Sequence, residues 1–212
     1  MVDTRRAYDD LSSIYTPIML GVVGLVLVLV VFAAIRFRDR GDGRRPWRRR
    51  EAPLVEGLYA LVLAVVAAVL VTITFRTETG VDRTSEPAGL EVRATAANWR
   101  WRFDYPRYGV SEIGGTDTLP TLLVPTNTNV RFSLVSVDVI HAFWVEELRF
   151  KRDAYPERPT TFDLVFSRPG RYTGHCAQFC GLRHSYMNFN VEALEPAAFQ
   201  RAMRERGSRP PA

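Results

Sequence analysis

The first third of the chain contains two long runs of apolar residues. Residues 18–35 (IMLGVVGLVLVLVVFAAI) carry no charge, and residues 54–75 carry one, Glu56, near their start. As α-helices they would extend about 27 Å and about 33 Å, which matches the roughly 30 Å hydrocarbon core of a bilayer. Their length and apolar purity favour membrane helices over buried helices of a soluble protein. We therefore predict a two-helix transmembrane hairpin, with helices at 18–36 and 54–75.

The first run could also be a cleaved signal peptide, because Arg5 and Arg6 precede it. Its apolar part is longer than a signal core, and no small-x-small cleavage pattern separates it from Arg36. We expect a retained helix that follows a short outer N-terminal segment, residues 1–17.

The segment between the two runs, residues 37–53, is rich in arginine. From Arg36 to Arg50 there are eight arginines and two acidic residues, Asp39 and Asp42. Short loops with this charge stay in the cytoplasm, so both termini should lie outside a bacterial-type cell membrane. Because helices in membrane lipid flank the loop, it is not a nucleic-acid-binding tract, and it explains part of the net charge of +5.

From residue 76 onward the pattern changes to short alternating runs. Large apolar residues alternate with polar ones in 130–134 and in 162–166, and TNTN and RPG are turn sequences. This predicts an all-β Greek-key sandwich or barrel, the extracytoplasmic domain at 76–198, and then a C-terminal tail, 199–212, that starts as a short helix. At Val137 the apolar parity reverses, which predicts a one-residue bulge that turns His141 toward the functional face.

The stretch HCAQFCGLRHSYM, residues 175–187, concentrates metal-binding side chains. It contains both cysteines, two of the three histidines and one of the four methionines of the chain. A Cys176–Cys180 disulfide would close a very small loop, where the entropic gain is least, and would leave the histidines and Met187 unexplained. Zinc could use two cysteines and two histidines but has no use for a thioether.

Copper can use every side chain of this set. Cys180, His184 and Met187, joined by His141, would form a mononuclear blue copper site. Cys176 adds a second thiolate, so that the two sulfurs could bridge two copper ions, each with its own imidazole. The weak ligands would be Met187 and a backbone carbonyl of the Cys-x₃-Cys loop. The residues favour a dinuclear copper centre and leave the mononuclear, disulfide and zinc alternatives open.

Three segments closely resemble the aromatic region and copper motifs of cytochrome c oxidase subunit II. They are ANWRWRFDY, DVIHAFWVEELRFKRDAYPER and GHCAQFCGLRHSYM. With the helical hairpin, the resemblance runs from about residue 15 to 195. It implies a cupredoxin-like barrel outside the membrane and a dinuclear copper A centre. The implied ligands are His141, Cys176, Cys180, His184, Met187 and the backbone carbonyl of Gln178.

The resemblance also implies a function. The chain would take electrons from a cytochrome c and pass them to haem in the large subunit I of a proton-pumping oxidoreductase with further subunits, where oxygen is reduced to water. Subunits that serve quinol-driven oxidases lack the cysteine and histidine ligands, so a cytochrome c donor is expected. Trp99 and Trp101 would form the electron-accepting region, with Trp101 packed near copper. Asp104 and Asp138 would lie near the docked donor, and Glu56 at the cytoplasmic mouth of a proton channel.

Two departures from the family change this picture. Gln178 stands where most relatives carry a glutamate that completes a magnesium or manganese site, and a neutral amide lacks the charge for it. Arg100, Arg102 and Arg107 replace an acidic rim around the aromatic patch. Because electrostatic complementarity governs partner choice, we expect an acidic or tethered donor, such as a membrane-anchored cytochrome c in a supercomplex.

Two other functions are compatible with these motifs: the copper A subunit of a nitric oxide reductase, and a membrane-tethered copper-binding protein. A nitrous oxide reductase would need many more than three histidines. No general acid, nucleophile or substrate pocket is recognisable, so the oxygen chemistry would belong to a partner subunit.

Overall fold

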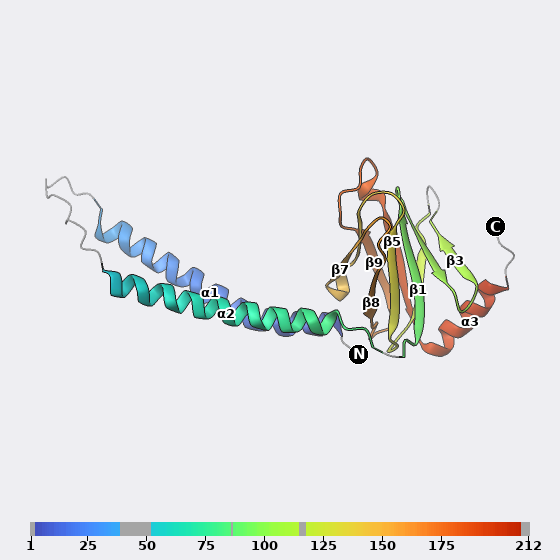
Figure 1. The fold of residues 1–212 in the computed structure, drawn as a ribbon, viewed down its shortest axis with the longest axis horizontal. Helices are drawn as coiled ribbons and strands as arrows, with labels where there is room; N and C mark the ends of the chain where they lie inside the picture. Colours follow the sequence, from blue (N-terminus) through green and yellow to red (C-terminus); the bar gives the residue numbers. More distant parts are fainter. Residues whose placement is uncertain (1–2, 39–51, 86, 115–117, 209–212) are drawn as a thin grey trace. The chain divides into compact units, whose positions relative to one another are not determined.

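The computed structural model describes residues 3–38, 52–85, 87–114 and 118–208. These residues form two compact units (Figure 1). One is a helical hairpin, Asp9–Glu78, and the other, called the β domain below, combines Met1–Tyr8 with Thr79–Ala212.

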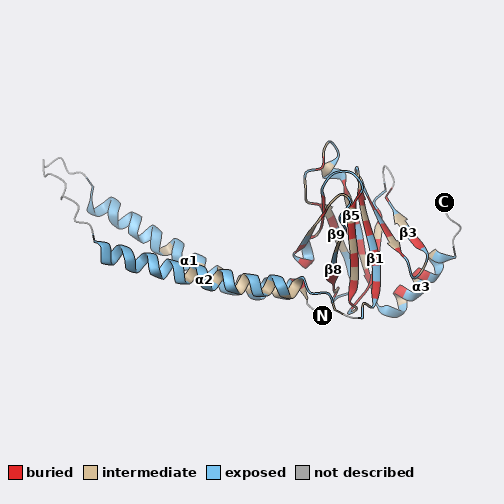
Figure 2. Ribbon diagram, viewed as in Figure 1, coloured by how far each residue is buried: buried red, intermediate tan, exposed pale blue. Residues whose placement is uncertain are grey.

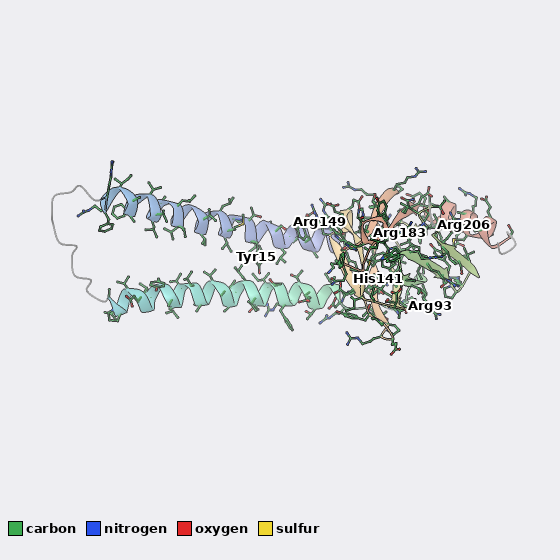
Figure 3. All side chains as sticks on the ribbon, turned by 90° about the horizontal axis from the view of Figure 1, so that it is seen from above. Tyr15, Arg93, His141, Arg149, Arg183 and Arg206 are labelled. Atoms are coloured by element: carbon green, nitrogen blue, oxygen red, sulfur yellow. The ribbon has the colours of Figure 1, made fainter. Side chains whose placement is uncertain are left out.

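The helical unit contains most of α1 (Thr4–Arg36) and of α2 (Pro53–Val81), both long and apolar enough to cross a membrane. Their apolar side chains are exposed along most of their length (Figure 2), as expected of helices that have lipid as their solvent. The Tyr15 hydroxyl of α1 donates a hydrogen bond to the Leu70 carbonyl of α2 at 3.1 Å (Figure 3).

Both helices are longer than the apolar runs. α1 continues through most of the expected outer segment 1–17, because the Asp3 carboxylate accepts a hydrogen bond from the Arg6 backbone N–H at 3.1 Å and caps the helix there. α2 continues past residue 75 to Val81. The predicted arginine-rich loop, 37–53, falls mainly on residues 39–51, which lie outside the described part of the chain.

The β domain is a sandwich of two five-stranded sheets. The first sheet has the order β3 (Val110–Ile113), β2 (Arg100–Tyr105), β1 (Leu90–Ala97), β5 (Val130–Ser136) and β8 (Thr160–Leu164). The second has the order β4 (Thr121–Pro125), β10 (Asn188–Leu194), β9 (Gly170–Cys176), β6 (His141–Val145) and β7 (Phe150–Ala154). β1 runs parallel to β5 and β4 parallel to β10, whereas the other pairs are antiparallel. Helix α3 (Pro196–Gly207) follows β10.

The predicted alternation is confirmed in β5 but not in β8, where Phe162, Asp163 and Leu164 are all buried. Along β5, residues 130, 132, 134 and 136 are buried while the residues between them are half-buried (Figure 2). Aromatic rings from both sheets fill the core, for example Phe132 against Phe162 at 5.2 Å and Phe143 against Phe189 at 4.9 Å between centroids.

The predicted bulge near Val137 is wrong. β5 ends at Ser136 in the first sheet, and the chain enters the second sheet with His141 as the first residue of β6. The parity reversal reflects a change of sheet through a four-residue connection, in place of an extra residue within one strand.

Ser85, in the linker that follows α2, is held to the first sheet by a buried cluster. The Asp163 carboxylate accepts hydrogen bonds from the Ser85 backbone N–H at 2.6 Å and from the Asn129 side chain at 2.8 Å, and it pairs with Arg131 at 3.0 Å. Asn129 and Arg131 also donate to the Ser85 carbonyl. These four residues are called the linker cluster below.

Candidate metal centre

The metal-binding side chains lie where β9, β10 and β6 meet at one end of the second sheet. Cys176 ends β9, Met187 immediately precedes β10, and the loop between them contains a short 3₁₀ turn, η2 (His184–Tyr186). The Cys176 backbone N–H donates to the Met187 carbonyl at 3.0 Å and closes the base of this loop. β6 is the other neighbour of β9, with Phe143 opposite Cys176, so His141 arrives beside the loop from a strand 35 residues earlier.

The two sulfurs have separate partners. Cys176 Sγ lies 3.8 Å from His141 Nδ1 and 3.3 Å from the Gln178 backbone oxygen. Cys180 Sγ lies 3.6 Å from His184 Nδ1 and 3.9 Å from Met187 Sδ. These six residues are called the ligand set below.

The ligand set fits a soft metal. Cys176 Sγ and Cys180 Sγ are 3.8 Å apart, compared with about 2.05 Å in a disulfide, and both are free thiols. One ligand atom each from His141, Cys176 and Cys180 lie within 4.8 Å of one another, and all three residues are buried. Donors this close without bonds between them are suited to sharing metal ions. The inclusion of a thioether favours copper over zinc.

The thiols cannot both ionise easily without a cation. Burial alone would raise the pKa of Cys176, but the hydrogen bonds with His141 and with the Ala142 and Gln178 backbone together outweigh this and lower it. Burial would lower the pKa of His141, but its contacts with Cys176 and Asp138 together raise it. Burial and the adjacent Cys176 sulfur both raise the pKa of Cys180. Because metal binding requires deprotonated thiols, a bound cation would supply the charge that the second thiolate needs.

The two tryptophans occupy different environments. Trp99 lies in the β1–β2 turn, is half-buried, and donates from its indole Nε1–H to the Cys180 carbonyl at 3.0 Å. Its ring passes over Gly181, where φ is +108° and a Cβ would lie 3.4 Å from the indole. Trp101 is fully buried and donates to the Met187 carbonyl at 3.3 Å. Of the two tryptophans, Trp99 reaches the surface. Trp101 packs beside the ligands and cannot contact an electron-donating protein directly.

The predicted docking carboxylates also differ. Asp138 lies beside the ligand set, with Oδ1 2.7 Å from His141 Nε2. Asp104 lies near the far end of β2, where it pairs with Arg102 at 2.7 Å and accepts a hydrogen bond from Ser111. The structure therefore brings Asp138 to the centre but not Asp104.

The expected ring of arginines around the aromatic patch is only partly present. Arg100 follows Trp99 directly, but Arg107 lies beyond the end of β2, about 20 Å away at about 3.3 Å per residue. The prediction for Arg107 is wrong, because an extended strand carries residues that are near one another in sequence far apart in space. Arg183 is exposed in the loop between Cys176 and Met187 (Figure 3). It is a further positively charged residue at the end of the β domain that carries the ligand set, and the sequence analysis does not identify it.

The remaining candidates are placed as follows. Glu56 is exposed in the first turn of α2, within the helical unit. The Gln178 side chain is half-buried. His175 packs against Trp144, lies 3.1 Å from Asn188 through Nδ1, and is not among the residues that approach the sulfurs.

Comparison with known proteins agrees with this geometry. A family model described as "Cytochrome C oxidase subunit II, periplasmic domain" matches residues 90–194. The probable cytochrome c oxidase subunit 2 of Streptomyces avermitilis is 29% identical over 220 residues, covering 86% of this chain and 68% of the relative. The subunit 2 of Corynebacterium glutamicum is 28% identical over 246 residues, covering 89% and 68%.

The fold also has a counterpart among solved structures. The periplasmic domain of subunit II of cytochrome oxidase from Bradyrhizobium japonicum superposes with a TM-score of 0.53 and 26% identity, covering 58% of this chain and 96% of that one. This confirms the predicted fold, two apolar helices followed by a cupredoxin-like β-sandwich. On the family match, the relatives and the shared fold together, the chain belongs to the cytochrome c oxidase subunit II family.

Proposed function

We propose that this subunit of an oxidoreductase complex receives electrons from a cytochrome c at a dinuclear copper A centre and passes them to haem in the large partner subunit. The observation that carries the proposal is the pair of unbonded thiols, 3.8 Å apart, each with its own imidazole. Reduction of oxygen to water would take place in the partner.

The separate neighbours of the two cysteine sulfurs support a site with two copper ions rather than one. Cys176 has His141 and the Gln178 carbonyl beside it, whereas Cys180 has His184 and Met187. Each sulfur thus has one strong nitrogen donor and one weak donor. A mononuclear site would leave one of the buried thiols without a role.

The chain's residues contribute rigidity and isolation from water. His141 is fully buried, and Cys176, Cys180 and Met187 are each at most 7% exposed. Two copper ions held there would supply one-electron chemistry shared between two nuclei. Trp99, half-buried and hydrogen-bonded to the Cys180 carbonyl, offers a short covalent and hydrogen-bonded path from the surface to a ligand.

Exposed apolar side chains at this end of the β domain support a protein partner. Among the described residues of the domain, they are concentrated in the two loops that frame the ligand set: Val137, Val139, Ile140, Phe179, Leu182 and Tyr186. Large exposed apolar patches mark interaction sites. We assign this surface to the large subunit and the cytochrome donor. Arg100 and Arg183 nearby favour a donor that is acidic or tethered.

The family and the two apolar helices indicate a membrane protein with an extracytoplasmic domain. Our finer proposal is that both termini lie outside a bacterial-type membrane and that Glu56 lies at the cytoplasmic mouth of a proton channel formed with the large subunit. The neutral Gln178 argues against a magnesium or manganese ion at the subunit boundary.

Metal analysis and low-temperature EPR of the purified complex test the proposal. We expect two copper ions bound by this chain and hyperfine structure from two equivalent nuclei. One copper per chain, or hyperfine lines from one nucleus, would instead indicate a mononuclear site and contradict the proposal.

A further inference from the structure

The carboxylate of Asp138 contacts two parts of the centre at once. Oδ1 lies 2.7 Å from His141 Nε2 and accepts a hydrogen bond from the Val139 backbone N–H at 2.7 Å. Oδ2 accepts a hydrogen bond from the Asn98 backbone N–H at 2.6 Å. Asn98 directly precedes Trp99 in the β1–β2 turn. Both oxygens are therefore engaged within the chain.

The first contact determines which nitrogen of His141 can bind a metal. A neutral imidazole carries one hydrogen, and an ionised carboxylate can only accept a hydrogen bond. The hydrogen must therefore lie on Nε2, which leaves the lone pair of Nδ1 free. Nδ1 is the atom that faces Cys176 Sγ, at 3.8 Å. Such outer partners commonly fix the tautomer and ring orientation of histidine ligands.

The second contact holds the turn that carries Trp99. The turn is attached on one side by the bond from Asn98 to Asp138, and on the other by the bond from Trp99 to the Cys180 carbonyl. Trp99 is therefore held between groups adjacent to two different ligands, His141 and Cys180.

We propose that Asp138 is a positioning residue, in place of the docking role that sequence resemblance suggested. Oδ1 keeps Nδ1 of His141 available to copper, and Oδ2 fixes the Trp99 turn against the ligand loop. This inference rests on the proposed copper function. Both oxygens of Asp138 already accept hydrogen bonds within the chain, one from each side of the centre.

Asp138→Asn tests the proposal in the intact complex, because the amide has nearly the same shape but a single acceptor oxygen. If that oxygen faces His141, the amide nitrogen opposes the Asn98 N–H and the turn loses its acceptor. If the amide is flipped, its N–H faces Nε2 and favours the wrong tautomer. We expect copper to be transferred to a chelator roughly 10–100 times faster, with altered hyperfine couplings.

Two further variants make the result decisive. Asp104→Asn, the same change at a carboxylate remote from the ligands, should behave like the unaltered protein. Asp138→Glu keeps the negative charge but displaces the oxygens, so positioning predicts copper loss whereas docking predicts nearly normal behaviour. The inference is overturned if Asp138→Asn slows only the reaction with cytochrome c while copper retention and EPR are unchanged. The number of copper ions bound by the unaltered protein tests the proposed function independently of these variants.

Discussion

The β domain contains two buried polar clusters that differ in one instructive respect. In the linker cluster, Asp163 meets Arg131, Asn129 and Ser85 at 2.6–3.2 Å, so that each charge has a partner within the chain. In the ligand set, the groups approach one another only to 3.3–3.9 Å. The first cluster is held by hydrogen bonds and an ion pair of ordinary length, whereas the second consists of sulfur, nitrogen and oxygen donors that converge at longer distances.

β5 connects the two clusters, since Arg131 lies near its start and Ser136, at its end, leads into the loop of Asp138. The comparison suggests a general distinction. Buried charged groups joined by short hydrogen bonds stabilise a fold, whereas buried thiols, imidazoles and a thioether that converge on one point are the donors of a metal site. Substitutions should therefore affect stability at the linker cluster and metal content at the ligand set.

Cys180→Ser should have the largest effect. A serine hydroxyl cannot replace a bridging thiolate, so the dinuclear centre should be lost. Electron transfer should fall by more than the roughly 100-fold that loss of a group supporting a ligand can cost. The domain should stay folded, because the linker cluster is untouched. Copper content, EPR and turnover of the complex measure this.

His175→Asn is the matched control for Cys180→Ser. This histidine is next to Cys176 in sequence, but it contacts Trp144 and Asn188. It should retain both copper ions. Two copper ions with an unaltered spectrum in Cys180→Ser would refute the assignment of the sulfurs.

Asp163→Ala should show the opposite behaviour. It removes the carboxylate that binds Arg131, Asn129 and the Ser85 N–H, and breaking a buried ion pair costs about 3 kcal/mol. The β domain should unfold at lower denaturant concentration, whereas copper content at low temperature should stay normal. Asp104→Ala, which removes a half-exposed pair with Arg102, should cost less than about 1 kcal/mol. Equal losses in the two variants would contradict the special role of the linker cluster.

The linker cluster should also make the domain sensitive to acid. Burial alone would raise the pKa of Asp163, but hydrogen bonds from Arg131, Asn129 and Ser85 outweigh it and hold the pKa below its ordinary value. The stabilisation is therefore present above the unfolded pKa of roughly 4 and is lost as the pH falls through the lower folded pKa. Melting temperatures from pH 6 to 3 should fall more steeply in the unaltered protein than in Asp163→Asn. Parallel curves would exclude Asp163 as the cause.

The sequence predicts the strands better than their arrangement. Alternation in 130–134 and 162–166 correctly locates β5 and β8, although the polar residue of β8, Asp163, is itself buried through its pairing with Arg131. Alternation does not say which sheet a strand joins, and a change of sheet before His141 produces the same reversal of parity as a bulge. Likewise, the place of Arg107 depends on the direction of β2, which sequence proximity to Trp99 does not encode.

The candidate site could be predicted in large part because most of its ligands belong to one loop. Residues 176–187 contain five of the six members of the ligand set, so their spacing alone indicates a metal. The arrangement around Asp138 is different in kind. Its oxygens are oriented by His141, three residues away, and by the backbone of Asn98, 40 residues away, and no local pattern records such a contact.

The smallest expected effect, from Met187→Leu, distinguishes a ligand from a core residue within the ligand set. Met187 is 1% exposed and its sulfur lies 3.9 Å from Cys180 Sγ, so leucine should fill the space and copper should remain. Loss of a weak donor should raise the reduction potential by about 60 mV or more, which corresponds to a tenfold change in the one-electron equilibrium. Met203→Leu, at an equally buried methionine of α3, should leave the potential unchanged. If redox titration gives the same potential for both variants, Met187 belongs to the packing of the core and the ligand set contains five members.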